Sequence, residues 1–220
     1  MRIALIHALK HSIPAIEAAF ARLWPEASLA NLLDDSLSTD LAREGSLTPA
    51  MHQRFLTLAR YAASCGADGI LFTCSAFGPC IEACASDLAP LPVLKPNEAM
   101  IEEAVALAGP EGRIALMATF APTLVSMPAE FAAAAPKLKL VPCLAEGALA
   151  AMDRGDPAAH DRAAAQAAAG LRDVDAIALT QFSLARANTL VAAASGKPVL
   201  TTPDSAVRKL RRLLLRKEAA

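Results

Sequence analysis

The chain has 220 residues, enough for one large domain or two small ones, and a formal net charge of −1. Hydrophobic residues make up 55% of it and charged residues 20%, which excludes a disordered chain and argues against a nucleic-acid binder. No apolar run approaches the roughly 20 residues that a membrane span needs. The five cysteines are unevenly spaced and predict no disulfide framework. We therefore expect a cytoplasmic protein with no nucleic-acid or membrane partner.

Short strand-like runs alternate with helical ones through the first part of the chain. Thr48 has the side chain of a helix cap, and Pro49 is suited to the first position of the helix that follows. The pattern predicts strands at residues 2–8, 27–33, 69–73 and 92–96, and helices at 14–24, 49–65, from Gly78 onward and at 97–109. Residues 34–49 read as a long polar loop, which we expect to act as a lid.

The second part of the chain repeats the first. Residues 113–119 (RIALMAT) match residues 2–8 (RIALIHA) almost letter for letter. Residues 174–187 align with 67–80, and residues 196–207 align with 88–100 through a shared Pro-Val-Leu. Three matches in the same order indicate an internal duplication. Strands that alternate with helices predict an α/β fold, here two pseudo-symmetric flavodoxin-like halves with parallel sheets.

The duplication also predicts the domain boundaries. We expect the last helix, after Pro203, to pack back on the first half, so that the first half comprises residues 1–96 and 203–220 and the second comprises 97–202. Leucines alternate with basic residues in this helix, which predicts an amphipathic helix with a solvated basic face. A pseudo-twofold relation between the halves would place an active-site cleft between the carboxyl ends of their strands.

Cys74 follows the third predicted strand and is the leading candidate for a catalytic residue. Backbone amides at the start of the next helix lack intrahelical acceptors, so they can hold a carboxylate or an enolate-like oxyanion. A thiol close to a helix N-terminus is also biased toward the thiolate. The predicted substrate-binding residues here are Thr73, Ser75, Ala76 and Phe77. The alternative is that Cys74 is a buried apolar filler, as many free cysteines are.

The repeat supplies a second strand-end segment without a thiol. Aligning Thr73 with Thr180 places Gln181 opposite Cys74. Gln181 exchanges no proton near neutral pH, but it can orient a substrate or donate a hydrogen bond. The candidate substrate-binding residues in this half are Thr119, Thr180, Gln181, Phe182 and Ser183.

Two further residues stand at strand ends. His7 ends the first strand and is a candidate acid or base, or a residue that tunes Cys74, with a structural histidine as the alternative. Lys95, at the end of the fourth strand, would favour an anionic substrate. His52 and His160 are expected on exposed helical stretches. The sequence has no glycine-rich nucleotide cradle and no cluster of metal ligands, so we expect neither cofactor nor metal.

The strand-end motifs FTCSAFG (72–78) and LTQFSLA (179–185), in a duplicated α/β chain, resemble the aspartate/glutamate racemase superfamily. This group includes aspartate, glutamate and hydantoin racemases, maleate cis-trans isomerase and arylmalonate decarboxylase. In the racemases each half supplies one cysteine, and the two act as acid and base on opposite faces of the substrate. Cys74 matches the first cysteine, and Gln181 stands in place of the second.

The resemblance implies a cofactor-independent isomerase or racemase that acts on a small carboxylate or related carbonyl compound through a single cysteine. His7 is a candidate replacement for the second cysteine. In this superfamily the decarboxylase uses one second-half cysteine to protonate an enediolate, and the maleate isomerase uses a first-half cysteine as a nucleophile. Decarboxylation and non-catalytic binding of a small molecule therefore stay open as alternatives. The apolar composition is compatible with a homodimer.

Overall fold

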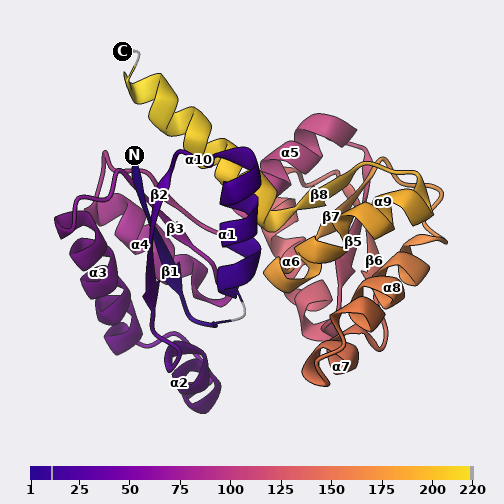
Figure 1. The fold of residues 1–220 in the computed structure, drawn as a ribbon, viewed down its shortest axis with the longest axis horizontal. Helices are drawn as coiled ribbons and strands as arrows, with labels where there is room; N and C mark the ends of the chain where they lie inside the picture. The colour runs from indigo at the N-terminus through magenta and orange to yellow at the C-terminus, as the bar shows by residue number, and fades with distance from the viewer. Residues whose placement is uncertain (11, 219–220) are drawn as a thin grey trace. The chain divides into compact units, whose positions relative to one another are not determined.

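The computed structural model describes residues 1–10 and 12–218, drawn as a ribbon in Figure 1. These residues form two compact units. The first comprises Met1–Pro96 together with Ala206–Ala220, and the second comprises Asn97–Ser205. Each unit is a parallel sheet with helices on both faces, as the alternation of strands and helices predicts.

The first unit contains a four-stranded parallel sheet of order β2-β1-β3-β4. This order places the first strand inside the sheet, as in flavodoxin-like folds. Its elements are β1 (Arg2–His7), α1 (Ser12–Leu23), β2 (Ser28–Leu33), α2 (Leu37–Glu44), α3 (Pro49–Ser64), β3 (Gly69–Phe72), the 3₁₀ turn η1 (Ser75–Phe77), α4 (Gly78–Asp87) and β4 (Val93–Leu94). The last helix, α10 (Thr202–Glu218), returns to this unit.

The second unit has the same strand order, β6-β5-β7-β8, again fully parallel. Its elements are α5 (Glu98–Ala108), β5 (Arg113–Ala118), α6 (Ala121–Ala134), β6 (Lys139–Leu144), α7 (Ala148–Asp153), α8 (Pro157–Ala168), β7 (Ala176–Leu179), the 3₁₀ segment η2 (Phe182–Ala187), α9 (Asn188–Ser195) and β8 (Val199–Thr201). The two units are therefore structural repeats, as the sequence matches predict.

The repeat extends to individual backbone hydrogen bonds. In the first unit the amide of Thr73 donates to the carbonyl of Ile6 at 3.1 Å, and in the second the amide of Thr180 donates to that of Met117 at 3.1 Å. The starts of β1 and β5 are also held by equivalent hydrogen bonds. The backbone amides of Arg2 and Arg113 donate to the carboxylates of Asp68 and Asp175, each at 2.7 Å. This shared register makes Gln181 the counterpart of Cys74 and Ala118 the counterpart of His7.

Apolar side chains from both faces of each sheet build the cores. In the first unit one face packs against α3 and α4, and the buried residues there include Ala4, Ile6, Ile70, Phe72, Phe55, Phe77 and Ile81. In the second unit one face packs against α7, α8 and α9, and the other against α5 and α6. Strands that are buried on both faces read as continuous apolar runs, which is why they were recognisable in the sequence.

The last helix packs on the first unit from Ala206 onward. Leu210 and Leu214 of α10 are buried, and a Cβ atom on Gly69 of β3 would lie 2.9 Å from Cδ1 of Leu210. The helix therefore approaches β3 closely because Gly69 has no side chain. Among residues 1–10 and 12–218, no helix is both long and apolar enough to cross a bilayer.

The polar segment 34–49, expected as a loop and lid, is mostly helical. Helix α2 occupies its middle and ends at Gly45, which adopts the left-handed conformation with φ 70°. Leu37 is buried, and Arg54 of α3 donates to Asp40 at 2.7 Å and also to Asp34. The expectation of an irregular loop was wrong, because a buried leucine and ion pairs to a helix further along the chain stabilise a segment whose residues are mostly polar.

Candidate active site

Cys74 lies at the carboxyl end of β3, where the chain turns into η1. Its backbone is extended (φ −130°, ψ 119°), and the residue is half-buried. Burial raises the pKa of the Cys74 thiol, and a hydrogen bond from the Ala76 backbone only partly counters this. This direction is opposite to the thiolate-favouring position that the sequence suggested, because burial disfavours the charged form of the thiol. The neutral thiol that burial favours is a proton donor.

Of the three residues after Cys74, two are exposed and one is buried. Ser75 and Ala76 are exposed. The Phe77 side chain is fully buried, with its ring centroid 4.8 Å from that of Phe55 in α3. Of the predicted binding residues in this segment, Phe77 thus offers only its backbone, and its ring anchors the turn to the core.

His7 is buried beside the residue that precedes Cys74. Its Nδ1 lies 2.9 Å from Oγ1 of Thr73, and its Nε2 lies 2.9 Å from Oδ1 of Asn31 in β2. Both ring nitrogens therefore have partners within the protein. Burial lowers the pKa of His7, against smaller raising effects of the Asn31 hydrogen bond and the Glu17 charge. His7 thus contacts Thr73 rather than offering a free nitrogen to a ligand.

Lys95 follows β4 and is engaged in an ion pair. Its Nζ lies 2.6 Å from Oε1 of Glu82 in α4. The pair is partly exposed, so its contribution to stability is about 0–1 kcal/mol. The Glu82 carboxylate nevertheless neutralises the positive charge of Lys95, which the sequence suggested would attract an anionic substrate. In this structure Lys95 therefore links β4 to α4.

The equivalent junction of the second unit is built from neutral donors and acceptors. The Gln181 Oε1 atom accepts from the backbone amide of Thr119 at 2.7 Å and from its hydroxyl at 3.0 Å. The Thr180 hydroxyl donates to the carbonyl of Met117 at 2.9 Å. Phe182 is buried and Ser183 is half-buried. These contacts bring Thr119 and Gln181 together, and the Gln181 side-chain nitrogen is left to donate a hydrogen bond.

His160, expected on an exposed stretch, is instead buried at 1% exposure. Its Nδ1 lies 2.8 Å from Oδ1 of Asp161, and Arg186 donates to the same carboxylate at 2.9 Å. The expectation failed because α8 packs against both α7 and α9, so that polar positions on this helix are covered. His52 is half-buried in α3.

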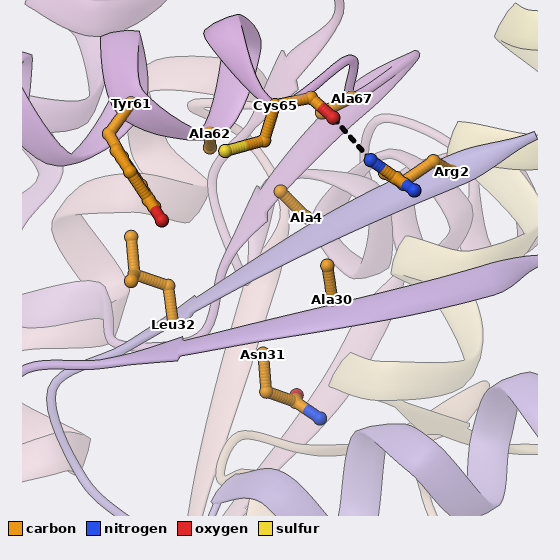
Figure 2. A pocket seen from close by; sticks show the side chains of 9 residues that line it. All are labelled: Arg2, Ala4, Ala30, Asn31, Leu32, Tyr61, Ala62, Cys65 and Ala67. Atoms are coloured by element: carbon orange, nitrogen blue, oxygen red, sulfur yellow. Dashed lines mark hydrogen bonds between the residues drawn. The ribbon is translucent and has the colours of Figure 1, made fainter.

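A cavity of about 220 Å³ lies near the beginning of β1. Figure 2 shows the side chains that line it, which come from β1, β2 and the end of α3: Arg2, Ala4, Ala30, Asn31, Leu32, Tyr61, Ala62, Cys65 and Ala67. The Arg2 guanidinium at its edge donates to the carbonyl of Cys65. His7 and Cys74 stand at the opposite, carboxyl ends of their strands, so this cavity is separate from the candidate active site. Within the described part of the chain, no group of three or more His, Cys, Asp or Glu could hold a metal ion.

Comparisons with known proteins place this fold. No protein-family model and no curated protein sequence matches the chain. Among solved structures, allantoin racemase from Klebsiella pneumoniae is similar with a TM-score of 0.73 and 18% identity, covering 99% of this chain and 89% of that one. Glutamate racemase from Bacillus anthracis is similar with a TM-score of 0.69 and 13% identity, covering 98% and 82%. A variant of arylmalonate decarboxylase, with one introduced cysteine and another changed to serine, is similar with a TM-score of 0.66 and 22% identity. The match covers 97% of this chain and 92% of that one.

The chain therefore shares its fold with these racemases and with arylmalonate decarboxylase, which confirms the two-unit α/β fold that the sequence predicted. On this fold, the chain combines a cysteine at the first strand-to-helix junction with a glutamine at the second.

Proposed function

We propose that this chain catalyses cofactor-independent proton transfer at a carbon atom next to a carboxylate, as an isomerase or racemase, with Cys74 as its single proton carrier. The observation that carries the proposal is the position of Cys74, at the carboxyl end of an inner strand and directly before the exposed residues Ser75 and Ala76. This is where open α/β sheets bind ligands. Similarity in fold to racemases and to a decarboxylase supports it.

The reaction uses groups that the chain itself supplies. The Cys74 thiol first loses its proton to solvent. The amide and hydroxyl of Ser75 hold a carboxylate oxygen, while the Cys74 thiolate takes the proton from the neighbouring carbon. The electron pair of the broken C–H bond moves into the carboxylate and gives an enediolate. The enediolate then turns and presents its opposite face, or a different carbon atom, to Cys74. Return of the proton from the thiol forms the new C–H bond of the product and restores the thiolate, with no net oxidation or reduction. Because Gln181 exchanges no proton, one thiol performs both transfers.

Decarboxylation is the second candidate, and the raised pKa of Cys74 favours it. A neutral thiol is ready to donate, whereas proton abstraction first requires its ionisation. In this reaction a C–C bond of a malonate-type substrate breaks, carbon dioxide leaves, and the electron pair forms an enediolate on the remaining carboxylate. The Cys74 thiol then protonates the carbon, and solvent returns a proton to the thiolate.

Proton exchange in deuterium oxide tests both candidates. Wild type, Cys74→Ser and the control Cys65→Ser, at an exposed thiol, are incubated with amino acids, hydantoins, hydroxy acids, malonates and maleate, and followed by NMR. Cys74-dependent deuterium next to a carboxylate without loss of carbon dioxide supports the isomerase or racemase. Carbon dioxide release from a malonate supports the lyase, and binding without turnover supports a binding protein. Exchange that persists in Cys74→Ser would show that Cys74 is not the proton carrier.

A further inference from the structure

A chain of hydrogen bonds connects the candidate active site to the surface of the first unit. It begins at Thr73, immediately before Cys74, and passes through the buried His7 ring to Asn31 in β2. From there the Asn31 Nδ2 atom donates to Oε1 of Glu17 in α1 at 2.7 Å. His7 is fully buried, whereas Asn31 and Glu17 are exposed. His7, Asn31 and Glu17 come from β1, β2 and α1, and Thr73 lies just after β3.

The chemistry of these groups fixes the direction of the bonds. An ionised carboxylate only accepts hydrogen bonds, so the atom of Asn31 that faces Glu17 is the amide nitrogen. The Asn31 oxygen consequently faces His7, and because that oxygen can only accept, the Nε2 atom of His7 must carry a hydrogen. Asn31 and Glu17 therefore determine which ring nitrogen of His7 is protonated.

The tautomer of His7 in turn sets the direction of the Thr73 hydroxyl. A neutral imidazole with its hydrogen on Nε2 presents a lone pair at Nδ1, so Thr73 Oγ1, 2.9 Å away, must donate to it. The other acceptor within reach, the carbonyl of Ile6, is 3.5 Å from the same oxygen. In the free protein the hydroxyl proton of Thr73 thus points to His7 and is not available to a ligand.

We propose that Asn31 and Glu17 are positioning residues that hold His7 in the Nε2–H tautomer, and that His7 takes up one proton when a carboxylate binds at Thr73. The added proton, from solvent, sits on Nδ1 and is donated to the Thr73 oxygen. The Thr73 hydroxyl then turns and donates its own proton to the carboxylate. The positioning role of Asn31 and Glu17 depends only on contacts present in the free protein. The proton uptake by His7 rests on the proposed function, because it requires an anionic substrate.

The charges around His7 suit such a switch. Glu17 of α1 faces the ring and favours its protonated form, while burial opposes it. The residues contributed by β2 and β3, Asn31 and Thr73, are neutral. Asp34, just after β2, donates its backbone amide to the His7 carbonyl, but its carboxylate pairs with Arg54. A carboxylate arriving at Thr73 adds a second negative charge near the ring, which shifts the balance toward the protonated form.

The second unit provides an internal control. Ala118 occupies the position of His7 there, and the hydroxyl of Thr180 donates to a backbone carbonyl. A backbone carbonyl does not titrate between pH 5 and 9. The hydroxyl of Thr180 therefore keeps its direction whatever the pH, and no proton uptake is expected at this junction.

Nitrogen NMR of the histidine rings in the free, full-length protein tests the positioning role without any ligand. His7 is assigned by comparison with His7→Gln. We expect the Nε2–H tautomer at pH 7.5 in wild type and in Glu17→Gln, whose amide oxygen still accepts from Asn31. In Asn31→Leu we expect the population of this tautomer to fall. An Nδ1–H tautomer in wild type, or an unchanged tautomer in a folded Asn31→Leu, would overturn the inference.

Calorimetry with malonate as the probe tests the proton uptake. Titrations at pH 7.5 in two buffers with different ionisation enthalpies give the number of protons bound, which we expect to approach one in wild type and in the control Cys65→Ser. Thr73→Val should bind with little uptake. Binding of malonate to wild type without uptake contradicts the coupling but leaves the proposed function intact. No binding at millimolar malonate counts against both, while the NMR result still decides the role of Asn31.

Discussion

The two strand-to-helix junctions of this molecule share a backbone and differ in chemistry. After β3 and after β7 the chain makes the same hydrogen bond to the neighbouring central strand, through Thr73 and Thr180. Each then enters a 3₁₀ segment, where Phe77 and Leu184 occupy equivalent, fully buried positions. The side chains between these fixed points are unlike: a thiol beside a threonine bound to imidazole in one unit, and a carboxamide bound to a threonine in the other.

This difference indicates how the duplicated scaffold divides its tasks. Strand pairing and core packing fix the backbone of both junctions, because each has buried anchors on the two sides of a short segment. The half-buried position between the anchors differs in its chemistry. In the first unit it carries Cys74, which exchanges protons, and in the second it carries Gln181, which only donates and accepts hydrogen bonds. Under the proposed function, the first junction performs the proton transfer.

The largest expected effect separates the two junctions directly. Cys74→Ser should lower kcat for the proton-exchange reaction by about 10²–10⁴-fold, because a hydroxyl is a far weaker acid than a thiol. Single-turnover exchange monitored by NMR measures the loss. Cys65→Ser serves as the matched control and should retain full activity. If Cys74→Ser retains more than a tenth of the wild-type kcat for proton exchange, Cys74 is not the proton carrier and the two junctions do not differ in this function.

Phe77→Ala tests whether the first junction is anchored by the core. The ring is fully buried against Phe55, so its removal should lower the free energy of unfolding by about 3–5 kcal/mol. Leu184→Ala, at the equivalent position, should cost about 2–5 kcal/mol. Urea denaturation measures both. A cost below about 1 kcal/mol at either position would mean that this junction is held by something other than its buried side chain.

Two substitutions at Gln181 separate its structural and ligand-binding roles. Gln181→Ala removes the acceptor for the Thr119 amide and hydroxyl and should lower the free energy of unfolding by about 1–3 kcal/mol. Gln181→Glu retains a carboxyl oxygen for Thr119 and should keep most of this stability, but its charge should raise KM for an anionic substrate. Equal KM values for Gln181→Glu and wild type would indicate that Gln181 does not face the substrate.

The smallest expected effect concerns pH. Because burial lowers the pKa of His7, the folded state binds fewer protons than the unfolded state below about pH 6.5. The stabilisation from neutral His7 is therefore present above that pH and is lost as the pH falls through the pKa of the folded state. Urea denaturation at pH 7.5 and pH 5 should show a smaller acid-induced loss in His7→Gln than in wild type. Parallel curves for the two proteins would contradict the buried, neutral histidine.

Local patterns in the sequence were sufficient for most of the fold. Strands β1, β3, β5 and β7 are continuous apolar runs, and Thr48 with Pro49 marks the start of α3, where the Thr48 hydroxyl accepts from the Met51 amide. The repetition of RIAL at residues 2–5 and 113–116 identified the duplication, and the register of the sheets follows it. The edge strand β6 was missed, because Pro142 and exposed positions interrupt its pattern. Helix α2 was missed because its stability comes from α3.

The candidate site was located by the sequence, but its chemistry was decided by the tertiary structure. Cys74 and Gln181 could be paired from the repeat alone, since strand ends follow from apolar runs. The raised pKa of Cys74, the ion pair of Lys95 with Glu82 and the burial of His160 all depend on residues from other elements. The chain from Thr73 through His7 and Asn31 to Glu17 joins positions up to 66 residues apart between direct partners. Short-range patterns carry no information on such contacts, because solvation and partner charges are set only when distant segments pack together.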